Sequence, residues 1–307
     1  QKFARMTNIT FCTTGHFYES YRDFWRLVEL SNFPIIPVSE LDISQEGVFI
    51  TAPMNEDWRE HINEQHKQGK RVNAHLVLWN IERPGGSAGG VGNYAEQCRY
   101  LVYGLWPNGE KTKQRAAGEI VESYGRFIDE VWVADRRLAE ETHLRFVVLG
   151  SDTGLGEPGS EKRYDFCHMS YELPHRAAIY NKFSAESIGP NSWPPERDEV
   201  LKQSKFGLNI HQEDRHTPFQ EPLRLALYAA YGLPIVTETI FDPYPWSDET
   251  AIFCSYDSIV RRLKQVLDED YEPYKQMGLR AREMMTGEFR FKTMVELAVS
   301  QSLDSWR

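Results

Sequence analysis

The sequence predicts an α/β protein built from two doubly wound domains that face each other across a cleft. In both halves of the chain, short apolar segments typical of strands alternate with segments of helical periodicity, which is the pattern of a parallel sheet covered by helices. A segment rich in glycine and charge, residues 152–162, separates the two series. The length of 307 residues also exceeds the range in which one core keeps growing. We therefore expect one Rossmann-like domain over residues 1–155 and a second over residues 156–307.

The elements of both domains follow from apolar runs and from helix start and stop signals. In the first domain, strands are expected to begin at Ile9, Gly47, Arg71, Glu130 and Arg145, with helices from Glu19, from Trp58 to a stop at Gly69, and directly after the Glu130 strand. In the second domain, a strand begins at Tyr164, helices lie near residues 174–183 and 195–202, and amphipathic helices begin at Asp257 and Phe291.

The composition argues against several classes of protein. A net charge of −10 and a pI near 5.5 disfavour broad binding of nucleic acid through phosphate neutralisation. The four cysteines, Cys12, Cys98, Cys167 and Cys254, form no CxxC pair, so we expect neither a zinc site nor a disulfide framework, and a cytoplasmic location is the simple inference. No apolar run approaches the roughly 20 residues of a membrane helix, so no membrane span is expected.

Residues 205–234 are the most informative segment, because they read as a strand, a polar loop and a buried helix. The strand alternates apolar residues and ends at Asn209 and His211. Pro222 suits the first position of the helix, and Gly232 suits its left-handed stop. The amino end of this helix points its free N–H groups and positive dipole end back toward the strand end, where phosphate could bind.

Two charged residues at the start of this helix suggest how a ligand would be held. Arg224, in the first turn, could donate a forked pair of hydrogen bonds to a diphosphate. Glu221, just before the helix, could accept hydrogen bonds from sugar or ribose hydroxyls. The alternative is an ordinary strand–helix unit with an exposed charged loop.

The same segments resemble a known family. SKFGLNIHQ from Ser204, EPLRLALYAAYGLPIVTE from Glu221, DPYPW from Asp242 and the helical tail are similar to the nucleotide-sugar-binding domain of GT-B glycosyltransferases, and look closest to the group that contains the CgeB-like spore-maturation proteins. In that group an Arg and a Glu open the helix. Arg224 matches the Arg, whereas Leu227 stands where the ribose-binding Glu would fall, so Glu221 or Glu238 could take that role.

The resemblance implies a nucleotide-sugar donor, most readily a UDP-sugar, with no further cofactor and no metal. It also implies that the last helix crosses back onto the first domain. The residues expected to hold the donor are Asn209, His211, Glu221, Pro222, Leu223, Arg224 and Glu238.

The acceptor is expected to bind the first domain, where three places compete. Glu82 ends a buried strand before a glycine-dense loop that could close over the substrates, and it is our first choice for activating the acceptor hydroxyl. His16, in TTGH after the first strand, is the second choice. Ser151 and Asp152 follow another strand, where Asp152 is a base or, as we favour, the start of a turn.

The sequence therefore predicts metal-independent transfer of a sugar from a nucleotide-sugar to a hydroxyl of a small molecule, a glycan or a modified nucleobase. If the mechanism is retaining, Glu82 becomes a positioning group. Two alternatives stay open: a sugar-nucleotide epimerase on the same scaffold, and a non-catalytic module that binds nucleotide-sugars.

Overall fold

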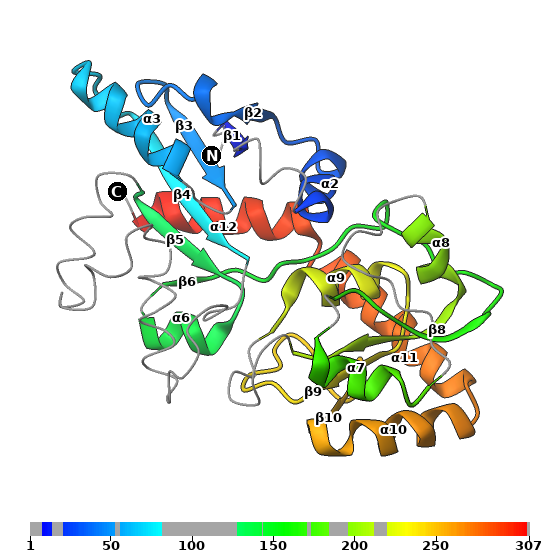
Figure 1. Cartoon of the computed structure of the whole chain (residues 1–307). Coiled ribbons are helices and arrows are strands. Elements are labelled where there is room, and N and C mark those ends of the chain that lie inside the picture. Colours follow the sequence, from blue (N-terminus) through cyan, green and yellow to red (C-terminus); the bar gives the residue numbers. More distant parts are fainter. Residues whose placement is uncertain are drawn as a thin grey trace. The chain divides into compact units, whose positions relative to one another are not determined.

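The computed structural model describes residues 8–13, 21–52, 56–81, 128–142, 144–170, 173–183, 196–211 and 220–305. The chain divides into two compact units (Figure 1). Unit 1 comprises residues 1–147 and 295–307, and unit 2 comprises residues 148–294. The chain therefore passes from unit 1 to unit 2 after Val147 and returns after Met294.

Unit 1 contains a six-stranded parallel sheet, as the alternation of strands and helices predicts. The strand order is β2-β1-β3-β4-β5-β6. The strands are β1 (Ile9–Thr13), β2 (Ile35–Pro37), β3 (Gly47–Thr51), β4 (Ala74–Asn80), β5 (Glu130–Val133) and β6 (Arg145–Phe146). The described helices of this unit are α2 (Arg22–Leu30), the short 3₁₀ helix η1 (Val38–Glu40), α3 (Glu56–Lys67), α6 (Arg136–Thr142) and most of α12 (Phe291–Ser305).

The winding of this sheet reverses at β1, which lies between β2 and β3. The carboxyl end of β1 is therefore the topological switch point, the place where ligands bind in open parallel sheets. Thr13 is the last residue of β1. The predicted His16 follows it in the sequence but lies outside the described residues.

Large aromatic side chains hold the core of unit 1 together. Phe24 of α2 packs edge-on against Trp79 of β4, with ring centroids 5.7 Å apart, and Trp79 packs in the same way against Trp132 of β5 at 5.6 Å. All three side chains are fully buried. Such pairs contribute about 0.5–1.5 kcal/mol each beyond the burial of their area. The aromatic row therefore fixes α2 against the middle of the sheet.

Unit 2 contains a four-stranded parallel sheet with the order β10-β9-β8-β7. The strands are β7 (Tyr164–His168), β8 (Ser204–Asn209), β9 (Ile235–Glu238) and β10 (Ala251–Cys254). The described helices are α7 (Pro174–Tyr180), α8 (Glu196–Gln203), α9 (Pro222–Ala230), α10 (Tyr256–Asp268), α11 (Glu272–Glu283) and the π-helical turn η3 (Met284–Glu288).

Helix α9 begins and ends where the sequence predicts. Pro222 is its first residue, and Gly232 follows it with a φ of 62°, the left-handed conformation that ends a helix. Every residue from Leu225 to Ala230 is buried, as the sequence predicts for this helix. A Cβ atom added to Gly207 of β8 would lie 2.7 Å from the Tyr228 ring, so this glycine lets α9 lie directly on β8.

The two stretches of chain that join the units are bonded to each other. The backbone N–H of Ser151 donates to the carbonyl of Met285 at 3.0 Å, and the Ser151 carbonyl accepts from the N–H of Phe291 at 2.9 Å. At Gly150 an added Cβ would lie only 1.6 Å from the Phe289 carbonyl oxygen. Only glycine allows the outgoing and returning segments to approach this closely.

Asp152 has a structural role in this junction. Its carboxylate accepts hydrogen bonds from the Gly154 N–H and from Nε of Arg290, both at 2.9 Å. These contacts are those of a turn residue tied to the returning segment, which agrees with the turn interpretation of Asp152.

No helix in the described parts of the chain has both the length and the hydropathy needed to cross a membrane.

Candidate functional site

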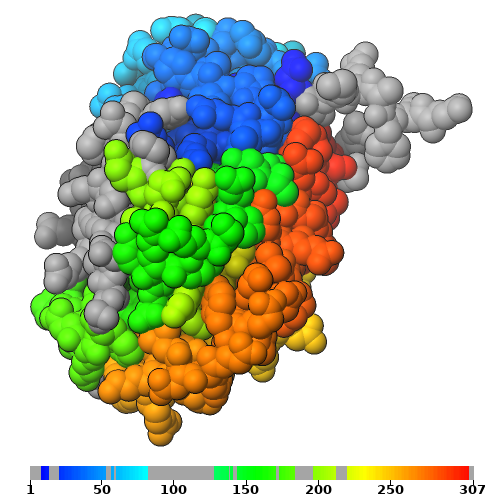
Figure 2. Space-filling view, turned by 90° about the vertical axis from the view of Figure 1, so that its right-hand side faces the viewer, coloured from blue at the N-terminus to red at the C-terminus, as the bar shows by residue number. Residues whose placement is uncertain are grey.

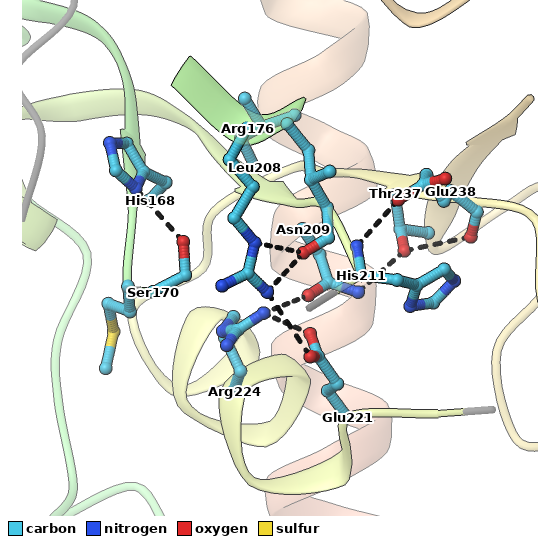
Figure 3. Close-up of polar contacts among 12 residues, drawn as sticks. His168, Ser170, Arg176, Leu208, Asn209, His211, Glu221, Arg224, Thr237 and Glu238 are labelled. Carbon is cyan, nitrogen blue, oxygen red and sulfur yellow. Dashed lines mark hydrogen bonds and ion pairs between the residues drawn. The ribbon is translucent and has the colours of Figure 1, made fainter. Parts of the chain in front are cut away.

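Polar side chains gather in unit 2 where β8 and β9 end and α9 begins (Figure 3). Strands β8 and β9 are parallel neighbours, with Asn209 opposite Thr237. Their carboxyl ends therefore meet at one edge of the sheet, and the amino end of α9 lies at the same edge. This is where the sequence predicts a ligand site.

Arg224 joins the start of α9 to the end of β8. Its Nη1 donates to Asn209 Oδ1 at 2.6 Å and also contacts Glu221 Oε2. Among the described residues, both of its hydrogen bonds use Nη1. Since a guanidinium has five N–H donors, Nε and Nη2 remain available for a ligand.

Two further bonds connect β8 to β9 at this edge. Asn209 Nδ2 donates to Thr237 Oγ1 at 2.9 Å. The backbone N–H of His211 donates to Glu238 Oε2 at 2.6 Å. Asn209, His211 and Glu238 are buried, so these bonds fix the floor of the site.

Arg176 of α7 is a second cation at the site, and it is completely buried. Its Nε and Nη2 donate to the Ile210 carbonyl at 3.0 and 2.6 Å. Its Nη2 also lies 3.6 Å from Glu221 Oε1. Nothing in the local sequence indicates these contacts, which join Arg176 to residues 34 and 45 positions away.

The amino end of α9 can receive an anion. Among the described residues no side chain caps it. Pro222 has no N–H, so the first-turn donors are the amides of Leu223 and Arg224, which have no partner within the helix. These amides and the positive end of the helix dipole favour a negative group.

His168, at the end of β7, adds no charge to this region. Burial, and then the positive charges of Arg224 and Arg176, lower its pKa to about 3. Its ring stacks on Tyr180 with centroids 3.5 Å apart, and its Nδ1 lies 3.2 Å from the hydroxyl of Ser170. The imidazole is therefore neutral in the folded protein at physiological pH.

Residues 243–246 form an aromatic corner after β9, and this corner is packed against the protein. Trp246 is buried, and the Trp246 N–H donates to the Pro243 carbonyl at 2.7 Å. Gln220, directly before α9, donates through Nε2 to the carbonyls of Asp242 and Tyr244. The corner thus supports the start of α9, and its Trp246 ring is not a surface on which a base could stack.

The structure brings together all the residues expected to hold a donor: Asn209, His211, Glu221, Pro222, Leu223, Arg224 and Glu238. The expected catalytic residues, Glu82 and His16, lie outside the described residues. Within the described part of the chain, no three His, Cys, Asp or Glu residues are grouped as a metal site would require.

Comparisons with known proteins bear on the fold. No protein-family model matches the chain. The chain is 27% identical over 124 residues to the uncharacterized protein L140 of Acanthamoeba polyphaga mimivirus, which is 38% of this chain and 40% of that protein.

Two solved structures are similar over most of this chain. TarM superposes with a TM-score of 0.56 and 11% identity, over 91% of this chain and 57% of TarM. An α-glucosyltransferase in complex with UDP-glucose and DNA containing an abasic site superposes with a TM-score of 0.53 and 12% identity, over 94% of this chain and 98% of that one.

The chain has the GT-B fold. Its two parallel-sheet units correspond to the two Rossmann-like domains of GT-B glycosyltransferases, as the sequence predicted. The chain spans less than two thirds of the L140 protein and of TarM, but nearly the whole of the α-glucosyltransferase. The closer likeness to the CgeB-like group stays a prediction.

Proposed function

We propose that this GT-B protein is a glycosyltransferase that moves a sugar from a nucleotide-sugar, most readily a UDP-sugar, to an acceptor hydroxyl without a metal ion. The observation that carries the proposal is the position of Arg224. This arginine stands in the first turn of α9, at the carboxyl edge of the unit 2 sheet, with two of its three nitrogens available to a ligand among the described residues.

In this proposal the diphosphate of the donor lies at the amino end of α9. The amides of Leu223 and Arg224 and the Arg224 guanidinium donate to its oxygens. Asn209 and the backbone of His211 lie at the end of β8 beside these groups, and the Asn209 side chain orients Arg224. Glu221 or Glu238 accepts hydrogen bonds from donor hydroxyls.

The reaction breaks the bond between the anomeric carbon and the β-phosphate oxygen, and forms a bond from that carbon to the acceptor oxygen. Negative charge then develops on the leaving nucleoside diphosphate, where the helix end and Arg224 stabilise it in place of a metal. The proton of the acceptor hydroxyl passes to a base, for which we propose Glu82 first and His16 second. The acceptor is a hydroxyl of a small molecule, a glycan or a modified nucleobase. The DNA in the α-glucosyltransferase complex supports the last of these, whereas the net charge of −10 counts against broad binding of nucleic acid.

A ligand screen followed by a product assay tests the proposal. UDP-, GDP-, CDP- and TDP-sugars are added to the protein, and we expect one of them to raise the melting temperature, because a ligand that binds only the folded state stabilises it. The same donor is then incubated with candidate acceptors. A new glycosidic bond supports transfer, an isomerised donor without that bond supports the epimerase, and binding without turnover supports the module. The absence of any nucleotide-sugar binding contradicts all three.

A further inference from the structure

We infer that Arg176 is a positioning residue of the proposed donor site, which sets the geometry and the charge of that site without touching the ligand. Its part in donor binding rests on the proposed function. The contacts that it makes are independent of that function.

The buried charge of Arg176 needs partners, because burying an unpaired charge is costly. Arg176 is 0% exposed, and a fully buried guanidinium is stable only when its donors are paired. Its partners are the Ile210 carbonyl and the Glu221 carboxylate. These two groups belong to separate segments, the end of β8 and the start of α9. Arg176 therefore joins three elements, since it is itself part of α7 (Figure 3).

The two partners of Arg176 lie at the two parts of the site that would present groups to a ligand. Ile210 stands between Asn209 and His211, so the two bonds from Arg176 to its carbonyl hold the backbone from which both neighbours are presented. Glu221 is the residue immediately before α9, and its other oxygen contacts Arg224. A substitution of Arg176 should therefore disturb both the backbone at the end of β8 and the start of α9.

Arg176 also changes the net charge of the site. Glu221 lies between two guanidinium groups, with Oε1 toward Arg176 and Oε2 toward Arg224. The pair of Glu221 and Arg224 alone is neutral. With Arg176 the three groups carry a net charge of about +1. The site also holds the carboxylate of Glu238, and Arg176 makes the whole site one charge more positive toward an approaching diphosphate in a region of low dielectric constant. Arg176 therefore offsets Glu221 and leaves the charge of Arg224 for the ligand.

A lysine cannot replace this arginine. The planar guanidinium donates from Nε and Nη2 to one carbonyl and still faces the carboxylate, whereas an ammonium group is a compact point charge without this fork. Arg176→Lys keeps the charge and loses the geometry. Arg176→Gln loses both.

The test compares Arg176→Gln and Arg176→Lys with the wild type, using Arg197→Gln as the matched control. Arg197 lies on α8 of the same unit, is also buried, and forms an ion pair with Asp198. Two quantities are measured: the Kd for inorganic pyrophosphate and for UDP by calorimetry, and hydrogen exchange of two amides, that of His211, which donates to Glu238 Oε2, and that of Leu225 in α9, which donates to the Glu221 carbonyl.

We expect Arg176→Gln to weaken pyrophosphate binding at least tenfold and to speed exchange at both segments. Arg176→Lys should speed exchange as well while it weakens binding less, because the charge is kept. Arg197→Gln should change neither quantity. Wild-type affinity and exchange in Arg176→Gln would overturn the inference, and so would equal effects in Arg197→Gln. If Arg176→Gln fails to fold, Arg176→Lys is compared with Arg197→Gln in its place, and wild-type affinity and exchange in Arg176→Lys would then overturn the inference.

The exchange measurement separates this inference from the proposed function. If the wild type binds neither pyrophosphate nor UDP, the proposed function fails. Faster exchange in the Arg176 variants would then still support the positioning of the two segments, and unchanged exchange would overturn it.

Discussion

Arg224 Nη1 lies 2.6 Å from Asn209 Oδ1, so the third residue of α9 and the last residue of β8 are joined by their side chains. The same asparagine donates to Thr237 on the neighbouring strand. One amide group therefore orients the arginine relative to the sheet. This relationship, and the buried groups around it, lead to the following predictions.

Asn209→Ala should weaken diphosphate binding about 5- to 30-fold. The change removes a charge-assisted bond that orients Arg224, and such bonds contribute about 1–2 kcal/mol net. Calorimetry with pyrophosphate measures the effect. Thr237→Val is the control, because it removes the other partner of Asn209 and leaves Arg224 bonded. An equal loss of affinity in both variants would show that pyrophosphate binding depends on the bond between Asn209 and Thr237 and not on the bond between Asn209 and Arg224.

Arg224→Ala should weaken binding of nucleoside diphosphate about 10- to 150-fold, the loss expected for about 1.5–3 kcal/mol from a charged hydrogen bond. Because its side chain is partly exposed, the fold should survive, which circular dichroism checks. Arg280→Ala, on α11, serves as the control: this arginine bonds only to the Glu249 carbonyl among the described residues. A wild-type Kd in Arg224→Ala would remove this residue from the phosphate site.

Unit 2 should lose stability in acid through His168. Its folded pKa is lowered to about 3, by burial and then by Arg224 and Arg176, from an ordinary value of 6.5. Below pH 6.5 the imidazole is protonated in the unfolded chain but stays neutral in the folded protein. The free energy of unfolding therefore falls by about 1.4 kcal/mol for each pH unit between 6.5 and 3.

His168→Phe keeps the stacking on Tyr180 and removes this titration. Urea titrations of the protein at pH 7, 6, 5 and 4 should show that the free energy of unfolding of the variant rises relative to that of the wild type as the pH falls. A constant difference between the two proteins across this range would mean that folding does not lower the pKa of His168.

Gly207→Ala should destabilise unit 2 by about 1–3 kcal/mol, the usual cost of overpacking. The added methyl group would lie 2.7 Å from the Tyr228 ring, which is fully buried between β8 and α9. Gly287→Ala is the matched control, since a Cβ there meets nothing within 4 Å. Urea unfolding of both variants measures the difference, and equal stabilities would show that α9 can shift away from β8 at little cost.

Glu82→Gln should lower the turnover number far more than the affinity for the donor, because the amide cannot accept the acceptor's proton. Steady-state kinetics give both quantities. A chelator should leave the rate unchanged, since in the proposed mechanism the helix end and Arg224 take the place of a metal. A wild-type rate in Glu82→Gln would exclude this residue as the base, and strict dependence on added Mg²⁺ would contradict the metal-free scheme.

Local signals in the sequence were enough to predict α9 and its site. Pro222 and Gly232 mark the ends of the helix in any context, and Asn209 and His211 follow an apolar strand whose end is easily recognised. For this reason the residues around the helix start can be grouped from the sequence alone.

The contacts of Arg176 could not be predicted in this way. They join residues that are distant in the sequence, and α7 is a short helix with no periodic pattern that marks an inward-facing arginine. The same limit applies to β6. The apolar run from Arg145 predicts a full strand, but only Arg145 and Phe146 pair with β5, because the chain then leaves the sheet to enter unit 2.

The junction at Ser151 has a consequence for protein engineering. Unit 2 is a single uninterrupted piece inserted into unit 1, and its entry and exit lie side by side because Ser151 is bonded to Met285 and Phe291. A gene segment that encodes residues 148–294 is thus a cassette with adjoining ends. Transplanting it between relatives of this fold would exchange the half that carries the proposed donor site in one step, with Gly150 retained so that the graft can close.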